Sequence, residues 1–200
     1  MRALTGPLAA ALLLYGGTAL ADNTSPSMLD AKERKTVENL IPFDMENFDL
    51  YREPRPFRDK RFLDPKGKET DLSEFEGNTL TVVNFWATWC PPCRKELPYF
   101  ENLRAELADE GIAVVTISLD RGGVDKAAAF FEGQNLDLPA YADPKASLSR
   151  QMGILGLPVT AILGPDAREI GRLTGEAKWN SDEAKAWLRA IAKAMEDGRA

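Results

Sequence analysis

Residues 80–98 read LTVVNFWATWCPPCRKELP and contain both cysteines of the 200-residue chain, Cys90 and Cys93. The run from residue 80 to residue 87 consists almost entirely of β-branched, aromatic and other apolar residues, which predicts a strand buried on both faces. Two prolines follow Cys90, and proline suits the first turn of a helix. Apolar residues then recur with a helical period as far as Gly111, a typical helix end. We therefore expect the cysteines at a strand-to-helix junction.

The position at the start of a helix predicts that one of the two cysteines is a reactive thiolate. Unpaired backbone N–H groups and the positive end of the helix dipole favour a thiolate at a helix N-terminus. Arg94 and Lys95 add positive charge beside it. A thiolate is the attacking species in disulfide exchange. We interpret the pair as a redox reagent. We expect Cys90, at the exposed end of the helix, to attack a substrate disulfide, and the more buried Cys93 to resolve the mixed disulfide.

Other uses of a cysteine pair fit the sequence less well. A disulfide that closes a four-residue loop stabilises by about 2 kcal/mol, against about 3 kcal/mol for a 15-residue loop. The chain has no histidine, so two thiolates alone cannot complete a zinc site, and a Cys–His nucleophile pair is excluded. We predict no metal site. A two-coordinate Cu(I) site on the two thiolates stays open as an alternative.

Composition and the N-terminus indicate an exported globular protein. The chain is 44% apolar and has a net charge of −6. It has no dense block of Lys and Arg that would bind the phosphate backbone of a nucleic acid. Residues 1–21 combine Arg2, an apolar stretch and a small-residue ending, the pattern of a signal peptide cleaved after Ala21. Residues 3–21 are uncharged, so an uncleaved membrane anchor is the alternative. We expect a periplasmic protein.

The rest of the chain predicts an α/β fold with a central mixed sheet flanked by helices. We expect residues 22–55 to be an extended lead-in that packs partly, with a helix near residues 29–40, and residues 56–200 to form one domain. Residues 112–119 predict a strand parallel to the first, because the helix between them makes a β-α-β unit. Further expected elements are a short strand and turn at 61–67, a helical turn at 72–75, a helix at 124–133, a strand at 138–142, a helix at 145–152, strands on either side of a turn at 164–166, and a last helix capped by Ser181.

The segment around the cysteines resembles the active site of thioredoxin-fold proteins, and specifically the TlpA-like branch of exported thiol-disulfide oxidoreductases. The similarity continues in DRGG (120–123), YADP (141–144), GILGLPVTAIL (153–163) and GEAKW (175–179). It implies a thioredoxin-like fold in which residues 120–142 add a helix and a strand in the middle of the domain. It also implies a membrane-embedded thiol donor for the electrons. No cofactor motif occurs in the chain, and we expect a monomer.

Pro158 has two readings. From the sequence alone it is a proline at the start of a strand. In the family that the chain resembles, this proline follows a cis peptide bond beside the cysteines, and the backbone of the preceding residue pairs with an extended substrate. The resemblance therefore implies that Leu157 and Pro158 contact the substrate together with Trp89 and Pro91.

One position departs from thioredoxin. Thioredoxin carries a buried aspartate where this chain has Asn84, and asparagine cannot act as a base at physiological pH. Cys93 must then lose its proton to water, to Glu96 or to the leaving thiolate, and the sequence does not choose among them. We expect five residues to tune the pair: Asn84, Pro92, Arg94, Lys95 and Glu96.

The direction of electron flow and the substrate follow from the resemblance. Strong oxidants of this fold commonly place a histidine between the cysteines, whereas this chain has Pro91 and Pro92, so we expect a reductant. The resemblance implies two classes of substrate, namely copper-centre assembly proteins of cytochrome oxidase and apocytochrome c, and DRGG with GEAKW favours the first. A Cu(I)-binding chaperone that uses Cys90 and Cys93 as ligands is the alternative from a different class.

Overall fold

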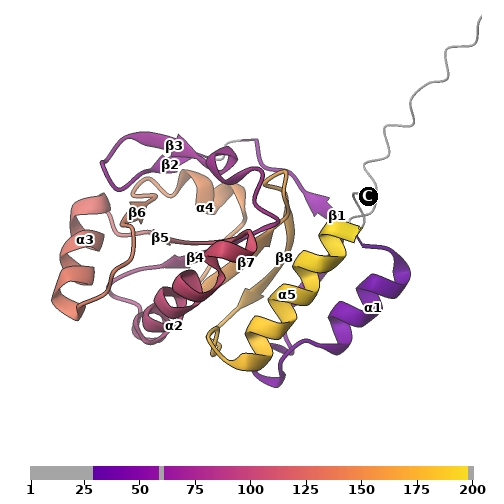
Figure 1. Cartoon of the computed structure of the whole chain (residues 1–200). Coiled ribbons are helices and arrows are strands. Elements are labelled where there is room, and N and C mark those ends of the chain that lie inside the picture. Colours follow the sequence, from indigo (N-terminus) through magenta and orange to yellow (C-terminus); the bar gives the residue numbers. More distant parts are fainter. Residues whose placement is uncertain (1–28, 59–60, 198–200) are drawn as a thin grey trace, which may run out of the picture.

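The computed structural model describes residues 29–58 and 61–197, which form one mixed sheet with helices on both faces (Figure 1). The eight strands follow the order β1-β8-β7-β4-β5-β6-β2-β3. In chain order the elements are α1 (Ala31–Asn39), η1 (Phe43–Met45), β1 (Asp49–Arg55), β2 (Arg61–Leu63), β3 (Glu69–Asp71), η2 (Leu72–Phe75), β4 (Leu80–Trp86), α2 (Pro91–Leu107), η3 (Ala108–Glu110), β5 (Ile112–Ser118), α3 (Gly123–Gln134), β6 (Tyr141–Ala142), α4 (Ser147–Gln151), β7 (Val159–Leu163), β8 (Glu169–Thr174) and α5 (Asp182–Asp197).

The predicted β-α-β unit is confirmed and forms the centre of the fold. All seven residues of β4 are buried, as expected for a strand covered on both faces. β4 pairs in parallel with β5, from Leu80 opposite Ile112 to Trp86 opposite Ser118. The crossover between them is α2 followed by η3, and Gly111 ends it with a left-handed φ of 69°, which glycine adopts at little cost.

The loops that adjoin β4, β5, β7 and β8 meet at one edge of this sheet because of the strand directions. β5 is parallel to β4, so the loops that follow these two strands leave the sheet at the same edge. β7 is antiparallel to β4, with Val159 opposite Phe85, so the loop before β7 reaches the same edge. β8 is antiparallel to β7, with Thr174 opposite Val159, which brings the loop after β8 there as well. The cysteines lie at this edge, directly after β4.

Different helices cover the two faces of the sheet. One core cluster joins Val82 of β4 to Phe100 of α2 and Trp187 of α5. The other joins Val83 of β4 to Leu148 of α4. The alternation of Val82 and Val83 between the two clusters shows that both faces of β4 are packed.

The inserted helix and strand are also present. α3 and β6 follow β5, and β6 pairs in parallel with β5, with Tyr141 opposite Ile117. Phe131 of α3 stacks on Trp86, the last residue of β4, with ring centroids 5.0 Å apart. The expected thioredoxin-like fold with an insertion in the middle of the domain is confirmed, and the insertion lies beside the cysteine-bearing loop.

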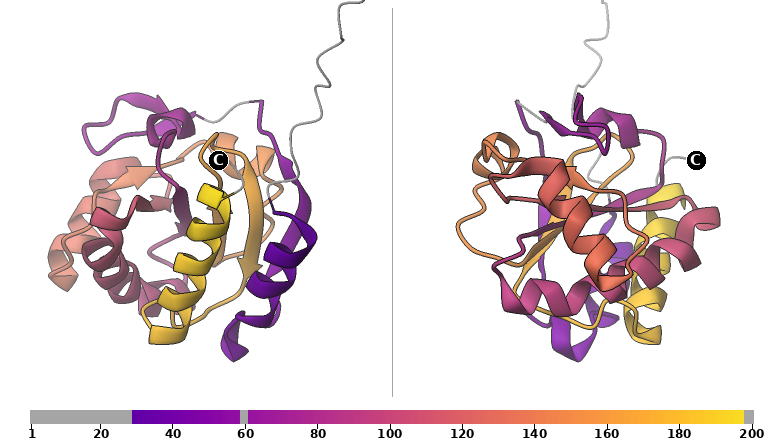
Figure 2. Two further views of the ribbon diagram at one scale, coloured as in Figure 1. Left: turned by 45° about the vertical axis from the view of Figure 1, so that its right-hand side comes forward. Right: turned by 90° about the vertical axis from the view of Figure 1, so that its left-hand side faces the viewer.

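Residues 31–55 pack more fully than the expected lead-in. α1 lies where a helix was expected, and the carbonyl of its Val37 accepts a hydrogen bond from the indole N–H of Trp187 at 3.1 Å. β1 adds an edge strand to the sheet by pairing with β8, with Leu50 opposite Gly171. Figure 2 shows α1 and β1 beside α5 and β8. The strand escapes pattern analysis because only Tyr51 of its seven residues is buried, so no alternation of apolar and polar residues marks it.

The expected signal peptide, residues 1–21, lies outside the described residues. Within the described ranges, every helix is too short or too polar to cross a membrane.

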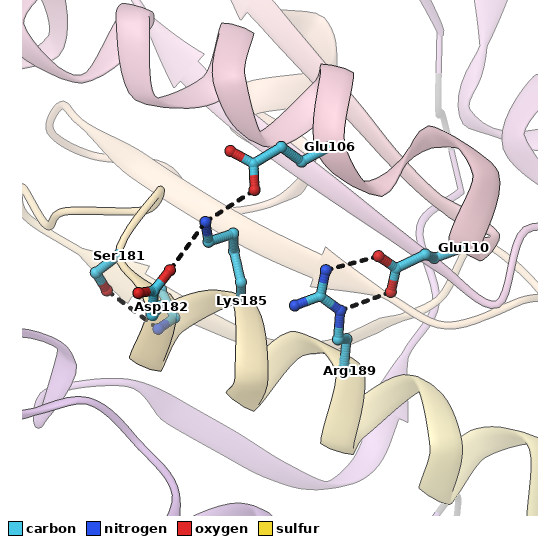
Figure 3. A network of polar contacts seen from close by, with 7 residues as sticks. Glu106, Glu110, Ser181, Asp182, Lys185 and Arg189 are labelled. Atoms are coloured by element: carbon cyan, nitrogen blue, oxygen red, sulfur yellow. Dashed lines mark hydrogen bonds and ion pairs between the residues drawn. The ribbon is translucent and has the colours of Figure 1, made fainter.

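Ion pairs join α5 to the end of α2 and to η3, which follows it (Figure 3). Lys185 Nζ lies 2.8 Å from a carboxylate oxygen of Glu106, and Arg189 binds both carboxylate oxygens of Glu110 at 2.6 and 2.7 Å. The Ser181 hydroxyl accepts the backbone N–H of Ala184 at 3.1 Å, which confirms the expected helix cap. Arg189 and Glu110 are exposed, so their ion pair adds little to the stability of the fold.

Gly171 tests the packing of β1 on β8. A Cβ atom at this position would lie 2.5 Å from Cε1 of Phe48 and 2.6 Å from the backbone oxygen of Asp49. We expect Gly171→Ala to lower the free energy of unfolding by about 1–3 kcal/mol, because β1 must shift to relieve the overlap. Urea unfolding measures the change.

The matched control is Gly133→Ala on α3, where a Cβ atom would meet no atom within 4 Å. This change should be neutral or stabilise the protein by up to about 1 kcal/mol, because alanine favours a helix over glycine. Equal stability of the two variants would contradict the close approach of β1 to β8.

Candidate active site

Cys90 and Cys93 form a disulfide at the start of α2, with their Cα atoms 5.3 Å apart. Cys90 is the N-cap of the helix, and its Sγ accepts the backbone N–H of Cys93 at 3.3 Å. The backbone N–H of Cys90 donates to the carbonyl of Ala87 at 3.0 Å, which closes a turn after β4. The predicted strand-to-helix junction is therefore confirmed. Its geometry places the Cys90 sulfur where helix N–H groups and the helix dipole favour negative charge.

The burial of the two sulfurs differs less than expected. The proposed order of attack assumed an exposed Cys90 and a buried Cys93, but Cys90 is only 4% exposed and Cys93 is 0% exposed. Both pack in an apolar cluster with Trp86 and Leu97, against which the half-buried Leu157 also lies. The position of Cys90 at the helix cap thus distinguishes the two sulfurs more clearly than solvent exposure does.

Further apolar residues lie on the loops at the same edge of the sheet as the pair. Trp89 is 65% exposed, and Pro91 is exposed on the first turn of α2. Pro158 is buried, and the peptide bond between Leu157 and Pro158 is cis. Leu155, which was not predicted from the sequence, is fully exposed on the loop before β7. An apolar residue next to a glycine in a loop was the available signal.

Asn84 lies on the β4 face that α2 covers, in a row of polar residues. It is opposite Thr116 of β5 and Thr160 of β7, and its amide nitrogen donates to the Thr160 hydroxyl at 3.0 Å. All three residues are buried. This row contains no carboxyl group, so a side-chain base for Cys93 would have to come from outside it.

Glu96 is the buried carboxyl group nearest to Cys93 in sequence, one helical turn along α2. Its side chain is 1% exposed and accepts the backbone N–H of Ala177 at 2.9 Å. Burial raises the pKa of Glu96 to about 8, and the opposing effects of the Ala177 N–H and the Trp179 side chain are smaller. The carboxyl group also lines a cavity of about 340 Å³ together with Lys95 and residues 176–178. Its pKa therefore lies near that of an ordinary thiol, about 8.5.

The remaining predicted residues lie on the first turn of α2. Arg94 and Lys95 are exposed and Pro92 is half-buried, and their tuning roles stay predictions. Within residues 29–58 and 61–197, no three Cys, Asp or Glu side chains are grouped to hold a metal ion.

A second residue missed from the sequence is Asp120, a buried carboxylate at the end of β5 that binds the turn before Trp89. An acidic residue directly after a buried strand, in DRGG, was the available signal.

Comparison with protein families matches residues 54–168 to the AhpC/TSA family. The thiol-disulfide oxidoreductase ResA of Bacillus thuringiensis subsp. konkukian (strain 97-27) is 28% identical over 128 residues, or 64% of this chain and 72% of that protein. A secreted thiol-disulfide isomerase from Corynebacterium glutamicum superposes with a TM-score of 0.61 at 23% identity, covering 78% of this chain and 95% of that chain. The peroxidoxin BcpB from Mycobacterium tuberculosis superposes with a TM-score of 0.59 at 27% identity, covering 72% of this chain and 97% of that chain. Because an isomerase and a peroxidoxin share this fold, the chemistry of the site has to decide the function.

The raised pKa of Glu96 predicts a specific dependence of stability on pH. In the folded protein Glu96 keeps its proton up to about pH 8, whereas the ordinary value is 4.5. The folded state therefore holds one more proton between these values. The contribution to stability is full below pH 4.5 and is lost as the pH rises through 8.

Glu96→Gln removes this titration and keeps an acceptor for Ala177. We expect the free energy of unfolding of the natural protein, relative to this variant, to fall by up to about 1.4 kcal/mol per pH unit between about pH 5 and pH 8. Urea unfolding of the oxidised proteins across this range measures the difference. A difference that does not change with pH would contradict the raised pKa.

Proposed function

Because this chain belongs to the AhpC/TSA family and is a thiol-disulfide oxidoreductase, we propose that it reduces disulfides of exported proteins through Cys90 and Cys93. The observation that carries the proposal is the disulfide at the N-cap of α2, where the Cys90 sulfur accepts a backbone N–H at 3.3 Å. A sulfur in this position is stabilised as a thiolate and can both attack and leave.

The reaction proceeds in two exchanges. In the reduced protein the Cys90 thiolate attacks one sulfur of the substrate disulfide, so that a bond from Cys90 to the substrate forms and the substrate disulfide breaks. The Cys93 thiolate then attacks Sγ of Cys90, which closes the internal disulfide and releases the second substrate sulfur as a thiolate. Two electrons pass to the substrate, and its sulfurs take up protons.

Glu96 is our choice among the three routes for the proton of Cys93. It lies one helical turn from Cys93, and positions three apart on a helix share a face. A pKa of about 8 lets the carboxylate form of Glu96 accept a proton from a thiol at little cost in free energy. The cavity beside Glu96 provides an exit for that proton toward solvent.

The substrate docks on the apolar side chains at the sheet edge. Trp89 and Pro91 are exposed on the side of the helix cap, and Leu157 and Pro158 belong to the loop that shares this edge. An extended segment of the substrate pairs with the backbone of Leu157, as one more strand would. These contacts present the substrate disulfide to Cys90.

The setting and partners of the reaction follow the sequence-based expectations. The protein is exported to the periplasm, with cleavage after Ala21 or anchoring by residues 3–21, and a membrane-embedded thiol donor reduces it again. Copper-centre assembly proteins are its substrates, and apocytochrome c is the alternative. The similarity to ResA and to a secreted thiol-disulfide isomerase supports an exported reductase in general terms.

The direction of electron flow predicts the reduction potential. The Cys90 sulfur accepts one backbone N–H, from Cys93, and Pro91 and Pro92 supply no side-chain donor that would stabilise the thiolate further. We expect a potential nearer to about −270 mV, as in thioredoxin, than to about −120 mV, as in a strong oxidant of this fold. Equilibration with glutathione buffers measures it. A value near that of the oxidant would reverse the proposed direction.

The experiment that tests the function is trapping of the mixed disulfide. Cys93→Ser keeps the attacking thiolate but removes the sulfur that resolves the intermediate, so covalent adducts with true substrates should accumulate in the periplasm. Cys90→Ser is the matched control and should trap nothing. Mass spectrometry of the adducts separates copper-centre assembly proteins from apocytochrome c.

Two outcomes would contradict the proposal. Trapping by Cys90→Ser but not by Cys93→Ser would reverse the roles of the cysteines. No trapping by either variant, combined with Cu(I) binding that needs both cysteines, would favour the chaperone.

A further inference from the structure

Asp120 is a buried carboxylate with four hydrogen-bond donors around it. Its side chain is 1% exposed. The backbone N–H and the hydroxyl of Thr88 donate to its two oxygens at 2.7 and 2.8 Å. The Ser118 hydroxyl donates at 3.0 Å, and Lys126 Nζ of α3 lies 2.8 Å away. Both carboxylate oxygens therefore have two partners each.

Two of these contacts hold the turn that carries the cysteine pair. Thr88 is the second residue of the turn that the Cys90 N–H closes onto Ala87. Trp89 and Cys90 follow Thr88 directly. The orientation of both residues therefore depends on how Thr88 is held, and Asp120 binds its backbone and its side chain together.

The carboxylate is charged in this environment. Burial alone would raise its pKa, but the hydrogen bonds from Lys126, Thr88 and Ser118 outweigh that effect and leave the pKa of Asp120 below its ordinary value. Hydrogen bonds to an ionised acceptor are roughly twice as strong as neutral ones. Thr88 is therefore tied by two strong contacts to the end of β5, a strand buried in the centre of the sheet.

We propose that Asp120 is a positioning residue for thiol-disulfide exchange, which fixes the Ala87–Cys90 turn through Thr88 and so aims the Cys90 sulfur at the incoming disulfide. Lys126 extends this anchor to α3, so the inserted helix supports the active site as well as the sheet. The proposal rests on the proposed role of Cys90 as the attacking sulfur.

A comparison within the chain separates positioning from simple burial. Asp143 is also 1% exposed and also follows a strand, but it accepts the backbone N–H groups of Ser147 and Ser149 at the start of α4. Within the part of the chain that the structure describes, the hydrogen bonds of the Asp143 carboxylate go to Ser147 and Ser149 and not to the turn that precedes Cys90. Loss of its charge should therefore disturb α4 and leave the active site unchanged.

Substitutions of Thr88 can change the shape of the side chain and its hydrogen bond separately. Thr88→Val keeps the branched shape but removes the hydroxyl donor, and Thr88→Ser keeps the donor but removes a methyl group. We expect Thr88→Val and Asp120→Asn to slow alkylation of Cys90 by iodoacetamide and reduction of insulin disulfides by about tenfold, since small displacements of a reacting atom are costly. Thr88→Ser and the control Asp143→Asn should stay within about twofold of the natural protein.

The measurements are made at a temperature at which thermal unfolding shows every variant to be folded. Recovery of the rate in Thr88→Ser together with its loss in Thr88→Val supports positioning. Natural rates in both Thr88→Val and Asp120→Asn, or a rate in Thr88→Ser as low as in Thr88→Val, would overturn it. A natural protein that alkylates normally but does not reduce insulin would count against the proposed function, while the alkylation rates would still decide the role of Asp120.

Discussion

The parallel pairing of β4 with β5 is the constraint on which the rest of the structure depends. All of β4 is buried. The turn after its last residue, Trp86, leads directly to Cys90 at the start of α2. The same pairing brings the end of β5 beside that turn. Asp120 can bind Thr88 because of this register. On the other side of β4, the antiparallel pairing with β7 brings Leu157 against the cysteines.

The site contains two buried carboxyl groups with opposite behaviour. Glu96 accepts one backbone N–H within hydrogen-bond distance, so desolvation dominates and its pKa rises to about 8. Asp120 has four donors around it, one of them a lysine, and its pKa falls below the ordinary value. Burial is nearly equal for the two side chains. At Glu96 desolvation outweighs the hydrogen bonds, whereas at Asp120 the more numerous donors, one of them charged, outweigh desolvation.

The parts of the fold that sequence reasoning predicted are those with a strong local pattern. The buried strands β4 and β5, the helix α2 and the cap at Ser181 all follow from apolar runs, periodicity and turn residues. β1 was missed because its side chains are mostly exposed and its pairing with β8 is a tertiary contact. The raised pKa of Glu96 and the burial of Cys90 could not be predicted from the sequence either. Glu96 is buried beside Ala177, and Cys90 packs near Leu157; both partners come from distant segments of the chain.

The position of the N-terminal segment has a mechanical consequence. A pull on the chain ahead of residue 29 would load α1 first, which is held to α5 by the bond from Trp187 to the Val37 carbonyl. The load would pass next to β1, an edge strand whose only partner strand within the described ranges is β8. In the sheet, β8 and β7 lie between β1 and β4, the strand that the cysteines follow. α1 and β1 would therefore take up such a pull before it reached the strand that the cysteines follow.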